Sequence, residues 1–279
     1  MRPRASASSF DAQASAYIAS VESADGQPLE PGVRLAITQF VIGCKRDGNW
    51  NAIKSSCLLM AARTLAGALV PLAGPAPTQT GFGSGDYSRT AGLTGNFSTK
   101  WINTNYGHST DPQNDFHMAF GGTAVVGWMI GRGLGNQPID SAIYVTGQAP
   151  SNVNISARGQ ASRPISGSTF FGGSRSSSGE MTSFTSAGGI QSHAVASGAP
   201  LSGNVFVFAT NFFNNGTPYN VTGCRCYFYS IGRALNVAAL YERVAAFRAA
   251  LPDAISAAPP PPASLWKVET FSPVYHWSM

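Results

Sequence analysis

The chain of 279 residues is long enough for one large domain or two small ones, each with a buried core. Only 11% of its residues are charged while 43% are hydrophobic, which excludes disorder driven by charge and leaves Ser, Thr, Asn, Gln and Gly to cover the surface. The net charge of +5 is carried by scattered basic residues without a run of three, so no nucleic-acid-binding surface is expected.

Residues 1–70 are predicted to form a helical docking region. Apolar residues recur there at the i, i+3, i+4 spacing of amphipathic helices in three stretches, which Gly26 and Gly48 separate. Pro31 occupies the first-turn position that proline favours. The three predicted apolar stripes are Ala14, Tyr17, Ile18 and Val21; Val33, Ile37, Phe40, Val41 and Cys44; and Trp50, Ile53 and Cys57.

Residues 71–232 are predicted to form a β-sandwich body. Gly and Asn turns divide this region into many short strand-like runs, the pattern of a sandwich or a barrel. The run 205–208 is apolar on both faces, which predicts an inner strand covered on two sides. The Ser/Gly-rich stretch 156–203 favours strands over a helix. The Gly-rich segment 131–136 lacks the helix that a phosphate site needs, so it predicts a hairpin turn.

The C-terminal part is predicted to contain a short helix at residues 233–252 and a Pro-rich extended tail at 253–279. Asn236 is a good helix cap, and Pro252 is expected to end the helix. The tail carries large apolar side chains that are costly to leave in water, so it should dock on its own domain or on a neighbouring subunit. The predicted assembly contacts are Trp266, Phe271, Tyr275 and Trp277.

Membrane insertion and disulfide bonding are not expected. No apolar run approaches the roughly 18 residues of a membrane-spanning helix, and no apolar core follows the basic N-terminus as it would in a signal peptide. The four cysteines are too few for a disulfide framework in a chain of this length. We therefore predict reduced core cysteines and synthesis in a cytoplasm.

No metal and no cofactor is expected either. Cys224 and Cys226 would share one face of a strand, but a zinc site needs four ligands and no companion pair follows. The segment 111–115 offers oxygen atoms for calcium but lacks the ligand spacing of a calcium loop, so a plain turn is the better interpretation.

Enzymatic activity is not predicted, because the patterns of catalytic residues are missing. Glycoside hydrolysis needs two carboxylates placed across the scissile bond, and no strand of the body aligns them. The four histidines are not accompanied by a Gly-x-Ser-x-Gly turn. The carboxylates of the body are Asp86, Asp111, Asp115, Asp140 and Glu180.

A carbohydrate-binding site is predicted where aromatic residues alternate with amides and a carboxylate. Aromatic rings stack on sugar rings, and amides bridge sugar hydroxyls. The alternative is that Trp101 belongs to the core and that the asparagines form turns. The candidate sugar-binding residues are Trp101, Asn103, Tyr106, Asp111 and Asn114.

Several blocks of the sequence resemble a family of virion proteins of tailed bacteriophages. These blocks lie at 17–72, 82–89, 92–100 and 229–240, and the last three read FGSGDYSR, GLTGNFSTK and YSIGRALNVAAL. The resemblance implies a jelly-roll body similar to concanavalin-A-like lectins. It also implies a location in the virion after synthesis in the cytoplasm of a host bacterium. By analogy with symmetric virion appendages, it implies a homo-oligomer, with a trimer expected.

Together these observations predict a mainly β protein that is a non-catalytic structural component of a bacteriophage virion. It would decorate the particle surface or form part of a tail fibre or spike, and it would bind other virion proteins through its terminal segments. Contact with host glycans is a further possible role of the same protein. Two alternatives stay open. One is a receptor-recognition lectin, and the other is a depolymerase that cleaves polysaccharides.

Overall fold

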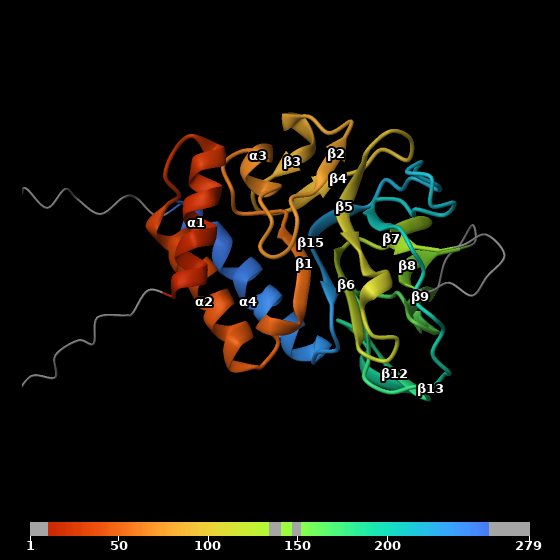
Figure 1. Ribbon diagram of the computed structural model, residues 1–279. Coiled ribbons are helices and arrows are strands. Elements are labelled where there is room, and N and C mark those ends of the chain that lie inside the picture. The colour runs from red at the N-terminus through yellow and green to blue at the C-terminus, as the bar shows by residue number, and fades with distance from the viewer. Residues whose placement is uncertain (1–10, 134–140, 147–151, 257–279) are drawn as a thin grey trace, which may run out of the picture.

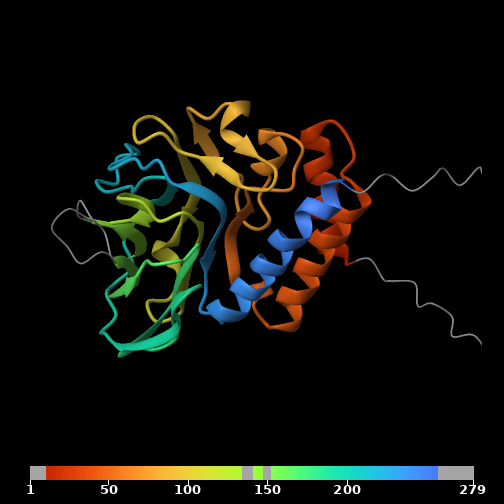
Figure 2. The same ribbon diagram turned by 180° about the vertical axis from the view of Figure 1, so that it is seen from behind.

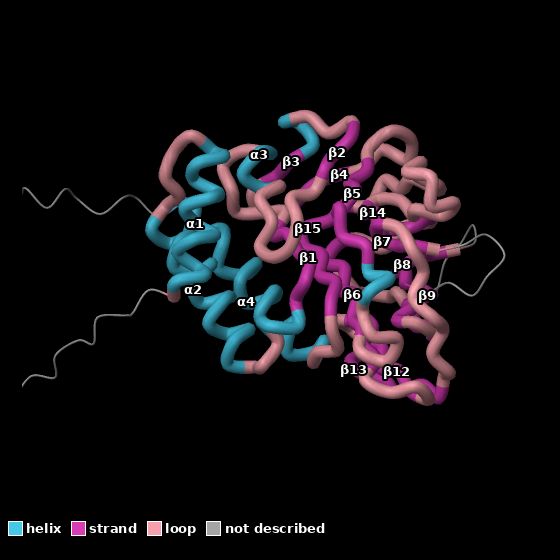
Figure 3. Tube along the Cα trace, in the orientation of Figure 1, coloured by secondary structure: helices cyan, strands magenta, loops and turns pink. Residues whose placement is uncertain are grey.

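The computed structural model describes residues 11–133, 141–146 and 152–256 of the chain. These residues form three layers: helices on one side, an antiparallel sheet (sheet A) in the middle, and a second antiparallel sheet (sheet B) on the far side (Figure 1; Figure 3). The prediction of a mainly β sandwich with N-terminal helices and a C-terminal helix is confirmed. The helices are α1 (Ala12–Asp25), α2 (Pro31–Arg46), α3 (Leu65–Ala68) and α4 (Val237–Ser256), with 3₁₀ turns η1 (Trp50–Ala52), η2 (Ser84–Asp86) and η3 (His108–Thr110).

Sheet A has the strand order β13-β12-β11-β6-β15-β4-β3, and β1 pairs with the same edge of β15 as β4. Sheet B has the order β10-β9-β8-β7-β14-β5-β2. The strands of sheet A are β1 (Ile53–Leu58), β3 (Tyr87–Ser88), β4 (Gly92–Thr94), β6 (Phe116–Gly122), β11 (Phe170–Arg175), β12 (Glu180–Thr185), β13 (Gly189–Ala194) and β15 (Arg225–Gly232). Those of sheet B are β2 (Thr78–Thr80), β5 (Trp101–Gly107), β7 (Gly127–Arg132), β8 (Ser141–Val145), β9 (Asn152–Ala157), β10 (Gln160–Pro164) and β14 (Asn204–Val207).

The sandwich core lies between the two sheets and follows from the alternation of side chains along each strand. On β6, Phe116, Met118 and Phe120 all point into this core, whereas Ala119 faces the helices. The inner strand predicted at 205–208 is confirmed, because β14 lies between β7 and β5 and is buried on both faces. The Ser/Gly-rich stretch also forms strands, as predicted.

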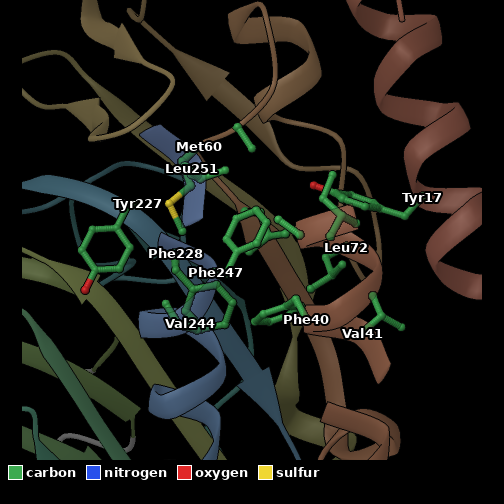
Figure 4. Packing of buried hydrophobic residues seen from close by; sticks show 14 of the residues in the cluster. Tyr17, Phe40, Val41, Met60, Leu72, Tyr227, Phe228, Val244, Phe247 and Leu251 are labelled. Carbon is green, nitrogen blue, oxygen red and sulfur yellow. The ribbon is translucent and has the colours of Figure 1, made fainter. Parts of the chain in front are cut away.

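A second core joins the helical layer to the outer face of sheet A (Figure 4). The ring of Phe40 on α2 lies 5.8 Å from that of Phe247 on α4 and 6.3 Å from that of Phe228 on β15. Seen from behind, the blue α4 runs beside the orange α2 (Figure 2). The two helices approach closely, since a Cβ atom on Gly32 would lie 2.8 Å from the Cα of Ala254. The helical layer is therefore continuous with the sandwich.

The prediction of a third helix through Trp50, Ile53 and Cys57 is wrong. Only the turn η1 is helical there, and the chain then extends into β1, which pairs antiparallel with β15. The hydrogen bonds of β1 satisfy the edge of β15 that β4 leaves open, and this long-range pairing outweighs three apolar residues at helical spacing. The sheet therefore begins before residue 71, the boundary predicted for the sandwich.

The last helix also differs from its predicted extent, because α4 continues through Pro252 to Ser256. A proline this near the end of a helix costs a backbone hydrogen bond. Burial of Leu251 and Ala254 on either side of Pro252 offsets that cost. The predicted assembly contacts Trp266, Phe271, Tyr275 and Trp277 lie outside the described residues.

The cysteines agree with the prediction of reduced core residues. Cys44, Cys57, Cys224 and Cys226 are all free and buried, as predicted. Within the described residues, no helix combines the length and the apolar character needed to cross a membrane.

Candidate functional site

The structure divides the five predicted sugar-binding residues into two groups at opposite ends of β5. Trp101 and Asn103 lie on the outer face of sheet B. Trp101 is half-buried, and its ring packs at a tilt against that of the buried Phe206, with the ring centres 4.5 Å apart. The Oδ1 atom of Asn103 accepts a hydrogen bond of 2.9 Å from the backbone N–H of Asn105, which has a positive φ of 54°. Asn103 therefore stabilises the local backbone.

The second group lies at the other end of β5. The Tyr106 hydroxyl donates a hydrogen bond of 2.6 Å to Oδ2 of Asp111. Burial, followed by this contact with the carboxylate, raises the pKa of Tyr106 above its usual value. Asn114 is half-buried, and its Oδ1 atom has no hydrogen-bond partner among the described residues. Tyr106 and Asp111 are thus engaged with each other, and they do not join Trp101 in one site.

A different set of aromatic residues forms a continuous stack, and the sequence analysis missed it. Its base is buried: the rings of Trp128 on β7 and Tyr144 on β8 lie parallel, 4.3 Å apart. Phe212 packs its edge on Trp128 at 6.3 Å and stacks on Tyr219 at 4.7 Å. Phe213 packs edge-on against Tyr219, with the ring centres 5.8 Å apart. The top of the stack is open to solvent, with Phe213 59% and Tyr219 40% exposed.

The loop that carries the top of this stack, residues 210–220, is called the aromatic loop below. Its two ends pair through N–H to carbonyl hydrogen bonds of 3.0 and 2.9 Å between Thr210 and Tyr219. Arg132 lies beneath it with 1% of its surface exposed and donates to the carbonyl oxygens of Asn211 (2.8 Å) and Phe212 (3.4 Å). The loop is therefore fixed from below before any ligand arrives.

Gly131 makes room for the base of the stack. A Cβ atom at this position would lie 2.8 Å from the Cβ of Ala142 and 3.2 Å from the indole ring of Trp128. The absent side chain lets the indole ring of Trp128 lie against Gly131, where the ring also contacts Phe212 of the loop.

Polar groups around the stack are amides and hydroxyls. Asn214, Asn215 and Asn220 are exposed on the aromatic loop itself. Beside the base, the Tyr144 hydroxyl donates a hydrogen bond of 2.9 Å to Oε1 of the exposed Gln160. Flat apolar rings next to uncharged donors and acceptors match the two kinds of surface that a sugar presents, its C–H face and its hydroxyl groups.

Two further carboxylates of the body are held by structural partners. Asp86 pairs with Lys100, and Asp115 accepts hydrogen bonds from the side chain of Arg233 (3.0 Å) and the backbone N–H of Ala234 (2.7 Å). Asp140 lies outside the described residues. Within the described ranges, no group of three or more His, Cys, Asp or Glu side chains is arranged to hold a metal ion.

The buried thiols are unsuited to metal binding as they stand. Burial raises the pKa of Cys224 and of Cys226 above the usual value for a thiol. The thiolate is the form that binds zinc, so these two side chains behave as small apolar core residues.

No protein-family model matches the sequence, and no curated protein matches it. Solved structures with a similar arrangement of strands include the K499G mutant of NanB sialidase from Streptococcus pneumoniae (10% identity, 57% of this chain, 26% of that chain, TM-score 0.37). A NanB complex described as "NanB plus Optactamide" has 11% identity, covers 55% of this chain and 27% of that one, and has a TM-score of 0.37. The Ruminococcus gnavus IT-sialidase CBM40 has 10% identity, 50% and 92% coverage and a TM-score of 0.32. The chain thus spans about a quarter of the NanB chains, and similarity this low carries no argument about function.

Proposed function

We propose that this protein is a non-catalytic carbohydrate-binding protein whose aromatic loop contacts the glycan. The observation that carries the proposal is the pair Phe213 and Tyr219, which are exposed side by side among exposed asparagines. Burying a large apolar side chain is worth roughly 1.5–3 kcal/mol. A sugar that stacks on the exposed rings would bury part of their surface, and this burial would contribute to the binding free energy. Arg132 and the Thr210–Tyr219 pairing hold the rings in place, which lowers the entropic cost of binding.

The proposal of a non-catalytic role is supported by the carboxylates. The hydrolase alternative would use Asp111 or Asp115. Asp111, however, accepts a hydrogen bond from Tyr106, and Asp115 accepts one from Arg233. Release of reducing ends from a host polysaccharide, abolished by Asp111→Asn or Asp115→Asn, would favour the depolymerase alternative instead.

Truncating the exposed rings tests the binding site. Phe213→Ala and Tyr219→Ala are expected to weaken glycan binding more than about tenfold, since each removes a stacking surface. The starting ligand comes from a glycan array, and affinities come from titration calorimetry. Leu35→Ala is the matched control, because Leu35 is a similarly exposed apolar side chain (57%) on α2 in the helical layer. A wild-type protein that binds no glycan on the array would refute the proposal.

We also propose that the protein is a structural component of a bacteriophage virion, displayed on the particle surface or in a tail fibre or spike. The sequence blocks described above support this placement. So does the layered fold: both described ends, Asp11 and Ser256, lie in the helical layer, with sheet B on the opposite side (Figure 1). An attachment through the ends would leave the aromatic loop facing outward. Density for this chain in a particle reconstruction tests the placement, and particles that assemble and infect normally without it would contradict it.

A further inference from the structure

We infer that the glycan bound at the aromatic loop is electrically neutral; this inference rests on the carbohydrate-binding function proposed above. The aromatic loop and its flanks, residues 209–224, contain no Asp, Glu, Lys, Arg or His. The described outer face of sheet B is uncharged as well. Cross-strand pairing places the following residues on it: Thr78, Thr80, Trp101, Asn103, Trp128, Gly131, Ala142, Tyr144, Asn154, Ser156, Gln160, Ser162 and Phe206.

The basic residue that contacts the loop, and the next one along the chain after it, both have partners within the protein. Arg132 is buried beneath the loop and donates to the carbonyl oxygens of Ser202, Asn211 and Phe212. Arg225, the next basic residue along the chain after the loop, is exposed but lies on β15 of sheet A, where its Nε donates to Thr94 at 3.3 Å. Neither guanidinium is directed at the exposed rings.

The two internal segments outside the described residues add no positive charge. The sequences of residues 134–140 and 147–151 contain no Lys, Arg or His, and Asp140 is their one charged residue. Any electrostatic contribution from these segments to an anionic ligand is therefore repulsive or absent.

This arrangement discriminates between neutral and acidic sugars on physical grounds. A sugar hydroxyl that leaves water can replace its hydrogen bonds with those of Asn214, Asn215 or Asn220. A carboxylate or sulfate would lose its hydration without gaining an opposite charge. The negative face of an aromatic ring adds a further repulsion when an anion lies over it. The loop therefore favours uncharged sugar units, and its affinity for them should not depend on ionic strength.

Matched pairs of glycans test the inference. For each neutral glycan that binds on the array, the affinity is compared by calorimetry with that of its sialylated or sulfated counterpart, at about 50 mM and about 500 mM NaCl. We expect the acidic counterpart to bind at least about tenfold more weakly. The affinity for the neutral glycan should be the same at both salt concentrations. Tighter binding of the acidic member would overturn the inference and leave the carbohydrate-binding function standing. Absence of binding to every glycan would instead refute that function.

A charge introduced into the loop supplies a second test. Thr217 is exposed, and its backbone N–H donates to Oδ1 of Asn215 at 3.0 Å. Any residue except proline keeps this N–H, so a substitution at this position retains the hydrogen bond. Thr217→Arg is expected to raise the affinity for the acidic counterpart several-fold at low salt, and the gain should vanish at high salt. Thr217→Gln is the matched neutral control and should give no gain. Equal affinities of the two variants for the acidic glycan would contradict the role assigned to the missing positive charge.

Discussion

His108 and His117 are buried completely in the sandwich, and each lies within hydrogen-bond distance of a serine hydroxyl. In His117, Nδ1 donates to the carbonyl oxygen of Arg233 (2.5 Å), so Nε2 accepts from the hydroxyl of Ser230 (2.8 Å). The bond that Nε2 accepts requires the neutral ring, because protonation would turn this nitrogen into a donor. Burial lowers the pKa of His117 to about 4 and that of His108 to about 3. These residues are structural groups that stabilise the fold only while uncharged.

The stability of the protein should accordingly fall in mild acid. An unfolded histidine binds a proton near pH 6.5, whereas the buried ones do not until about pH 4 or below. The unfolded state therefore binds more protons over this interval. The free energy of unfolding has its full value above about pH 6.5. Between about pH 6 and 4 it should decrease by about 1 kcal/mol per pH unit for each histidine. Urea unfolding at several pH values measures this slope.

His117→Gln separates this effect from the titration of carboxylates, which the variant retains. The amide of Gln keeps a polar group at the site but does not titrate, so the slope should fall by the roughly 1 kcal/mol per pH unit that His117 contributes. A wild-type stability that is constant from pH 6.5 to 4.5 would contradict the assignment.

At the scale of elements, local patterns and long-range pairing differ in how well the sequence reveals them. The helices α1 and α2 could be predicted because their apolar stripes and their ends at Gly26 and Asp47 are local signals. The strand β1 could not, since its partner β15 lies more than 160 residues further along the chain. Its three apolar residues are compatible with either structure until β15 is in place.

The aromatic loop was missed for a related reason. Phe212 and Phe213 follow an apolar strand, so the sequence predicts that the strand continues through them. The backbone instead turns at Phe208, which has a positive φ of 68° although it is not a glycine. The nearest sequence signal was the run of polar turn residues directly after the two phenylalanines, which places them at a surface.

The contact between α2, α4 and sheet A predicts that the helical layer and the sandwich unfold together. Phe40→Ala removes a ring that touches both Phe247 and Phe228, and it should cost about 3–5 kcal/mol of stability. Leu35→Ala on the same helix is the control and should change stability by less than about 0.5 kcal/mol, because Leu35 is exposed. Denaturant unfolding followed by both far-UV circular dichroism and tryptophan fluorescence measures the change. Separate transitions for helices and strands would show that the two layers are independent.

At the scale of the whole molecule, the ends of the described chain and the proposed binding loop lie on opposite sides of the layered fold. The helical layer holds both described ends of the chain, so it is the side through which further segments connect. Sheet B and the aromatic loop lie on the other side, where they do not compete with such a connection.

This division predicts two distinct effects of shortening the C-terminus. We expect the full chain to form a homo-oligomer through its C-terminal tail, so deleting residues 257–279 should reduce the mass measured by light scattering without lowering the melting temperature. Deleting residues 253–279 should lower the melting temperature as well, because it removes the last turn of α4, including Ala254, which packs on Gly32. If the shorter deletion leaves the oligomer intact, the tail is not the assembly contact. In that case the helical layer itself, with the exposed Leu35 on α2, becomes the surface to mutate next.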